Sequence, residues 1–199
     1  MKIILIGASG TVGQAALEAL SPRHEIITVG RTGGDIQIDI ERVENIRAMY
    51  KQVGKIDAVV CSIGDGHFGP LSEMKGHHVM LGINRKTLPQ INLVLEGLDY
   101  VNDAGSFTLT TGVLNRDPII GGAAAAAANG ALDSFVTAAA IDMPRRIRIN
   151  VVSPEILEAS REKYDGFFRG HRHVSNEEVG RAYCKSVEGA LTGRVFIVE

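Results

Sequence analysis

Three glycines near the start of the chain have the spacing that a phosphate-binding turn requires. The apolar run Ile3 to Ile6 predicts a buried strand, and Gly7, Gly10 and Gly13 follow it before a helical pattern begins. The first glycine permits a tight turn, the second lets a pyrophosphate approach, and the third lets the helix pack closely. Free N–H groups at the helix N-terminus would face the phosphates. The three glycines would also fit an ordinary strand-to-helix turn. The prediction of a phosphate-binding turn therefore rests on the strand before the glycines and the helix after them.

Arg31 directly follows the second predicted strand, where a dinucleotide site contacts the adenosine ribose. An acidic residue there would accept hydrogen bonds from a free 2′-hydroxyl, whereas an arginine pairs with a 2′-phosphate. Arg31 therefore favours NADP over NAD as the cofactor, although an arginine in a plain surface loop would look the same.

Short β-branched runs alternate with helical stretches along the chain. The pattern predicts strands at 2–7, 25–29, 36–39, 56–61, 105–110, 147–152 and 194–198, and helices at 12–20, 41–53, 71–101, 121–142 and 175–188. Uninterrupted apolar strands are typical of sheets covered on both faces, so we expect a Rossmann-like α/β fold with a doubly wound parallel sheet. Residues 1–199 are expected to form one domain. Only residues 31–35 precede the third strand, which should therefore be short or extended loop.

Composition argues against several function classes. The 199 residues carry a net charge of −2 and are 45 % hydrophobic, which predicts neither a nucleic-acid surface nor disorder. We expect no membrane span, because no segment approaches the roughly 20 apolar residues that one needs. Cys61 and Cys184 lack metal-ligand spacing and are expected to be small core residues, which favours a cytoplasmic protein. Residues 121–130 include six alanines, which predicts a helix with only small side chains. Such a helix is either buried or part of a subunit contact.

Further motifs follow the predicted strands and helices. They are Gly30-Arg31-Thr32, Asp39-Ile40, Cys61-Ser62-Ile63-Gly64, Asn84, Thr110-Thr111-Gly112 and the segment from Ile147 to Pro154. Together with the glycine turn, these motifs resemble the short-chain dehydrogenase/reductase family over nearly the whole chain.

The resemblance implies an NADP site and a homo-oligomer that pairs helices 71–101 and 121–142. It also implies a structural role for Asn84 and a carbonyl-polarising hydroxyl at Thr111. The implied cofactor-binding residues are Gly7, Ser9, Gly10, Thr11, Val12, Gly13, Arg31, Thr32, Asp39, Ile40, Ser62, Ile63, Gly64 and Pro154.

The chain departs from the family at the catalytic Tyr-x-x-x-Lys pair. Spacing places that pair at Gly121 and Ala125, and no tyrosine or lysine occurs between Gly112 and Arg161. Neither residue can donate a proton, and such a loss typically costs about 10²–10⁴-fold in rate.

Several side chains could replace the missing donor. They are Tyr164, His67, His171 and His173, although each histidine also fits a solvent-facing loop. No carboxylate or cysteine joins His171-x-His173 at ligand spacing, so we expect no metal site.

Two functions remain open at this point. One is an NADP(H)-dependent oxidoreductase that acts on a small carbonyl or alcohol through Thr111, Asn84 and a replacement donor. The other is a catalytically idle NADP(H)-binding sensor or interaction module. Lys163, Arg169 and Arg172 make the segment after Pro154 basic, which favours an anionic substrate or partner.

Overall fold

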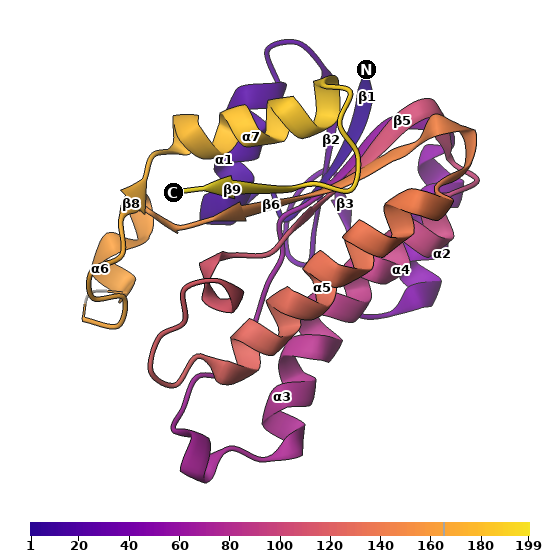
Figure 1. Cartoon of the computed structure of the whole chain (residues 1–199). Helices are drawn as coiled ribbons and strands as arrows, with labels where there is room; N and C mark the ends of the chain where they lie inside the picture. Colours follow the sequence, from indigo (N-terminus) through magenta and orange to yellow (C-terminus); the bar gives the residue numbers. More distant parts are fainter. Residues whose placement is uncertain (165) are drawn as a thin grey trace.

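The computed structural model describes residues 1–164 and 166–199, and a seven-stranded parallel sheet forms its centre (Figure 1). The strand order is β3-β2-β1-β4-β5-β6-β9. The strands are β1 (Lys2–Ile6), β2 (Glu25–Gly30), β3 (Ile36–Gln37), β4 (Ile56–Cys61), β5 (Val101–Thr110), β6 (Arg148–Pro154) and β9 (Val195–Val198). This order is that of a Rossmann-like doubly wound fold, so the predicted fold class is confirmed.

Helices cover both faces of the sheet (Figure 1). On one face lie α1 (Thr11–Leu20) and α7 (Asn176–Glu188), and on the other lie α2 (Val43–Val53), α4 (Leu88–Gly97) and α5 (Ala123–Asp142). Alternate residues of β1 serve the two faces, because Ile3 and Leu5 join one buried cluster while Ile4 and Ile6 join the other.

Short elements fill the connections at the carboxyl end of the sheet. The strands β7 (Ile156–Leu157) and β8 (His173–Val174) pair with each other, and α6 (Arg161–Tyr164) lies between them. Single 3₁₀ turns occur at this end at Leu71–Glu73, Val113–Asn115 and Glu158–Ser160, whereas Pro144–Arg146 forms one at the opposite end, shortly before β6.

The prediction of one continuous helix over 71–101 is wrong. The segment contains α3 (Gly76–Gly82), a π-helical turn at Ile83–Thr87 and then α4, and β5 already begins at Val101. Pro89 lacks the N–H that would bond to the carbonyl of Arg85, and the wider π turn lies directly before it.

The short connection between β2 and β3 is confirmed. The two strands pair in parallel over two residues only, Val29 with Ile36 and Gly30 with Gln37. Asp35 closes the intervening loop, because its carboxylate accepts hydrogen bonds from the backbone N–H and hydroxyl of Thr28 at 2.8 and 2.7 Å. These bonds lower the pKa of Asp35.

The helix α5 is the segment that bears on the expected absence of a membrane span. By length and composition alone, α5 is long and apolar enough to cross a membrane. In this fold α5 instead packs against β6 and the π turn, and it contributes Asn129 and Asp133 to a polar network.

The two cysteines lie in different surroundings. Cys61 is fully buried at the end of β4, as predicted, and burial raises the pKa of its thiol to about 12. Cys184 on α7 is only partly buried, and Arg23 donates to its Sγ at 3.2 Å.

The turn between β1 and α1 depends on two glycines. Gly7 has a φ of +82°, and a Cβ there would lie 2.9 Å from the carbonyl oxygen of Ser62. A Cβ at Gly13 would lie only 2.0 Å from the carbonyl oxygen of Gly7. The first glycine therefore supplies the backbone conformation, and the second allows α1 to approach the strand.

We predict that Gly13→Ala lowers the free energy of unfolding by about 3 kcal/mol or more, because the methyl group meets rigid backbone. Urea unfolding measures the loss. Gly76→Ala is the matched control, since a Cβ there has no neighbour within 4 Å, and it should leave stability unchanged or slightly higher. Equal stability of the two variants would contradict the packing argument.

Candidate functional site

A cavity of about 500 Å³ lies at the carboxyl ends of the central strands. The sheet grows in opposite directions from β1 and β4, and such a reversal opens a crevice between the two following loops. The cavity is lined by the turn after β1, the loops after β4 and β5, one face of α5 and the segment after β6. The predicted site residues in its lining are Gly10, Thr11, Val12, Ser62, Ile63, Gly64, Thr111, Ala125 and Pro154.

The glycine turn at one end of the cavity fits a dinucleotide pyrophosphate. Gly7 and Gly13 lie beneath the turn, and Ser9 is exposed beside it. Ser62 holds the turn to β4, because its hydroxyl lies 3.1 Å from the carbonyl of Ile6 and 3.2 Å from that of Gly7. The first turn of α1 contains no acidic side chain, so its amides present positive potential to an anion.

The residues predicted to contact adenosine lie outside the cavity lining. Arg31 and Thr32 are exposed directly after β2, next to β1. Asp39 accepts a hydrogen bond from the backbone N–H of Glu41, and Ile40 is buried at 7 % exposure. The structure thus places these four residues on the side of the sheet formed by β2 and β3. The Arg31 side chain is exposed there and accessible to a ligand.

Thr111 does not have the free hydroxyl that its predicted role requires. Its Oγ1 donates to the carboxylate of Asp133 at 2.9 Å, and Asn115 donates to the other carboxylate oxygen at 2.7 Å. A hydroxyl has one proton to donate, so Thr111 in this arrangement cannot polarise a substrate carbonyl.

Asn84 does not reach the cavity. It is exposed on the π turn and is not among the cavity-lining residues. A π turn contains an additional residue, which changes the side chain that faces the sheet. Lys86, two positions later, lines the cavity instead.

Lys86 is the functional candidate that sequence reasoning missed. Its Nζ donates to Asn129 Oδ1 at 2.6 Å and to the carbonyl oxygen of Thr111 at 3.3 Å. Burial lowers the pKa of its ammonium from 10.5 to about 8, although the charge of Asp133 opposes the shift. The sequence signal was a lysine two residues before Leu88, where the apolar helix begins.

The face of α5 corrects the placement of the missing catalytic pair. Ala125 and Asn129, four residues apart, line the cavity, whereas Gly121 precedes the helix and bonds to Gly69 through its carbonyl. A tyrosine–lysine pair facing this cavity would therefore occupy positions 125 and 129, one turn later than predicted. Asn129 fills the second position, and its Nδ2 donates to the carbonyl of Gly112 at 3.2 Å.

Of the proposed substitutes for the missing tyrosine, only Tyr164 lines the cavity. Its ring packs against Phe168 with centroids 5.6 Å apart, and the Lys163 ammonium lies 5.2 Å from the ring centre. His67 stacks on His78 with ring centroids 4.0 Å apart and is not part of the lining, and His173 starts β8.

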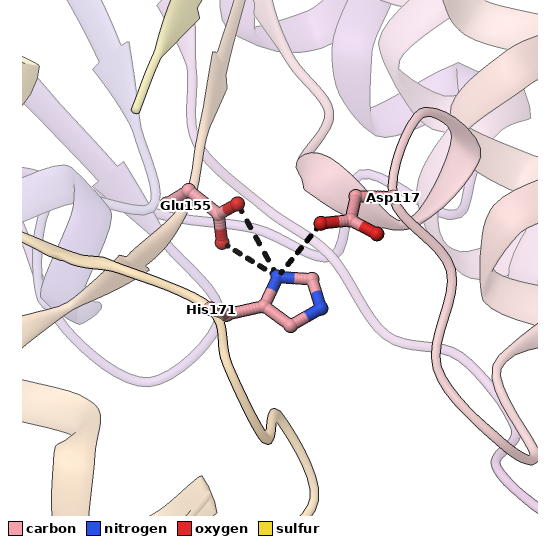
Figure 2. A group of neighbouring side chains, drawn as sticks. All are labelled: Asp117, Glu155 and His171. Carbon is pink, nitrogen blue, oxygen red and sulfur yellow. Dashed lines mark hydrogen bonds and ion pairs between the residues drawn. The ribbon is translucent and has the colours of Figure 1, made fainter.

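The His171 side chain contacts the carboxylate of Glu155 (Figure 2), and Glu155 is one of the cavity-lining residues. Its Nδ1 is 3.1 Å from Glu155, and both side chains are nearly inaccessible, at 5 % and 6 % exposure. Asp117, which is exposed, lies 3.8 Å away.

The expected absence of a metal site rested on sequence spacing, and it stays a prediction. In the fold, two carboxylates join His171 from positions distant in sequence, and the three donor atoms lie within 4.8 Å of one another. The Nδ1 of His171 lies 3.3 and 3.1 Å from the two carboxylate oxygens of Glu155, so a hydrogen bond between the two side chains accounts for their contact.

Comparisons with family models and with solved structures place this chain among known proteins. The family model described as enoyl-(acyl carrier protein) reductase matches residues 6–184. The crystal structure of the protein lin1944 from Listeria innocua is 51 % identical over the whole of both chains, with a TM-score of 0.97. A small-chain dehydrogenase in complex with NADPH is 18 % identical, covering 100 % of this chain and 96 % of that one, with a TM-score of 0.86. The comparison with curated proteins gives no match.

The fold and the glycine turn are those of the Rossmann class of proteins. Because the family model covers most of the chain, the chain belongs to the short-chain dehydrogenase/reductase family, a class of oxidoreductases.

We predict that His171→Ala lowers the free energy of unfolding by about 3 kcal/mol, because it leaves the Glu155 carboxylate buried without its partner. Thermal and urea unfolding measure the effect. His173→Ala is the matched control two residues away, and it should change stability by less than about 1 kcal/mol. The role of the ion pair would be refuted by the same loss in both variants.

Proposed function

We propose that the protein is an NADP(H)-dependent oxidoreductase that interconverts a small carbonyl compound and its alcohol. The observation that carries this proposal is that one cavity joins the glycine turn to the polar groups around Lys86 and Thr111. The nucleotide would be held by the turn after β1 and by the loop after β4. When bound, it would supply or accept a hydride.

The choice of NADP rests on Arg31. This side chain is exposed at the carboxyl end of β2, next to the glycine turn, where a guanidinium can pair with a 2′-phosphate. Two structures with similar folds, the small-chain dehydrogenase above and the protein BdcA, are described in complex with NADPH. BdcA is 20 % identical, covering 99 % of this chain and 92 % of that one, with a TM-score of 0.80.

The expected substrate has an apolar body. A second pocket of about 240 Å³ adjoins the cavity and is lined by Phe68, Ile119, Tyr164, Phe167 and Phe168, together with Lys163. Aromatic walls favour an apolar group, and Lys163 at the pocket and Lys86 in the cavity would favour a substrate that also carries a negative charge.

A catalytically idle NADP(H)-binding module is the second candidate. Ala125 and Asn129 favour it, because neither can act as the usual proton donor at the cavity-lining positions of α5. The two candidates differ in turnover: an enzyme consumes NADPH with a carbonyl substrate, whereas a sensor binds it without consumption.

We predict that the protein binds NADPH more tightly than NADH, and that Arg31→Ala weakens NADPH binding by about 10- to 100-fold, the strength of a charged hydrogen bond. Nicotinamide fluorescence measures both affinities. Arg181→Ala, which removes an exposed arginine on α7, is the control and should change neither. Equal affinity of wild type and Arg31→Ala for NADPH would refute the assignment of Arg31.

We also propose that two copies of the chain pair through the outer faces of α4 and α5. Large apolar side chains are exposed there, with Leu88, Leu95 and Ile141 at 45 %, 56 % and 85 %. The alanines of α5 leave its surface without large side chains, so the backbone of a second copy can approach closely. Exposed apolar patches of this kind favour self-association.

For this interface we predict that Leu95→Arg combined with Ile141→Arg converts an oligomer into a monomer, because buried charges without partners oppose association. Sedimentation velocity measures the mass. Ile197→Arg on the edge strand β9, at a residue 48 % exposed, is the control and should leave the mass unchanged. Dissociation by Ile197→Arg alone would assign the interface to the β9 edge.

A further inference from the structure

The fold places the Lys86 ammonium inside the wall of the cavity. The side chain passes over Gly64, where a Cβ would lie only 3.2 Å from the lysine Cδ and 3.3 Å from Nζ. An ammonium carries three N–H groups, and Asn129 and the Thr111 carbonyl accept two of them. Among the described residues, 1–164 and 166–199, one N–H is therefore left for a ligand in the cavity that Lys86 lines.

Close packing between two helices brings Lys86 to this position. A Cβ at Gly82 would lie 3.1 Å from the Cβ of Ala128, and the Thr87 hydroxyl donates to the carbonyl of Ala128 at 2.9 Å. Larger side chains on this face of α5 would push the π turn away. The small residues thus allow a lysine from another helix to contact Asn129.

The neighbouring hydroxyls in the inner wall are engaged elsewhere. Thr111 donates to Asp133, and Ser62 donates to backbone carbonyls beneath the glycine turn. Lys86 differs from them because burial brings the pKa of its ammonium to about 8. A general acid is most effective when its pKa lies near the working pH, so this ammonium can release a proton near neutrality.

We propose that Lys86 is the proton donor of this site, a catalytic role that rests on the oxidoreductase function proposed above. In the reduction direction, the carbonyl carbon receives a hydride from a reduced nicotinamide dinucleotide, and the C=O π electrons move to oxygen. The Lys86 ammonium gives that oxygen a proton. A C–H and an O–H bond therefore form, while a C–H bond of the reduced nicotinamide, the C=O π bond and an N–H bond of Lys86 break, and the nicotinamide is left oxidised. The neutral amine regains its proton from water.

The first test uses the nucleotide-free protein and does not depend on activity. Trace labelling with acetic anhydride at increasing pH, followed by peptide mass spectrometry, measures the titration of each lysine. We expect the labelling of Lys86 to rise around pH 8, below the ordinary lysine value of 10.5, and Lys51, an exposed lysine on α2, serves as the internal reference. Titration of both lysines over the same pH range would overturn the proposal.

The second test compares Lys86→Met and Lys86→Arg with the control Lys51→Met, using NADPH and a panel of activated ketones. Both Lys86 variants should lower kcat by about 100-fold or more, because neither side chain releases a proton near neutral pH. NADPH affinity, measured by nicotinamide fluorescence, should change by less than about threefold. The wild-type rate should fall as the pH rises through about 8.

The outcomes separate this role from the proposed function. Failure of the wild type to bind NADPH would overturn the proposed function itself. An unchanged kcat in Lys86→Met with NADPH binding intact would overturn the proton-donor role and leave the oxidoreductase function in place. Binding of NADPH without turnover of any ketone would also overturn the role of Lys86, and would favour the idle binding module.

Discussion

The rest of the site depends on the contacts that the carbonyl oxygen of Gly7 makes. This oxygen accepts a hydrogen bond from the backbone N–H of Gly10 at 3.0 Å and lies 3.2 Å from the Ser62 hydroxyl, and Gly13 packs directly against it. One oxygen thus joins β1, the loop after β4 and the start of α1. Because these segments meet there, a crevice opens between the loops that follow β1 and β4, where the strand order reverses. The backbone amides at the start of α1 lie at one end of this crevice.

Much of the fold could be predicted because its signals are local. The strand β1, the glycines at 7 and 13 and the alternation of strands and helices follow from patterns that extend over a few residues. The break before α4 is also local, because Pro89 was present in the sequence, but the apolar pattern on both sides concealed it.

The chemistry of the site could be predicted only in part, because its partners are distant in sequence. Asn129 lies 43 residues from Lys86, and Asp133 lies 22 residues from Thr111. Motif comparison indicates which positions a family uses, and it marked Thr111 and Asn84 on that basis. It does not indicate that Asp133 engages the Thr111 hydroxyl, nor that a π turn presents Lys86 in place of Asn84.

The position of Lys86 has a consequence for the stability of the whole protein. An ordinary lysine has a pKa of 10.5, so an unfolded chain holds this proton more tightly than the folded one. Below pH 8 the lysine is charged in both states, and the folded state bears a desolvation cost on the order of 3 kcal/mol. Between pH 8 and 10.5 the folded state releases the proton first, and the cost disappears. A domain with only some 5–15 kcal/mol of net stability thus gives up a sizeable part of it to hold one cation in the wall of the cavity.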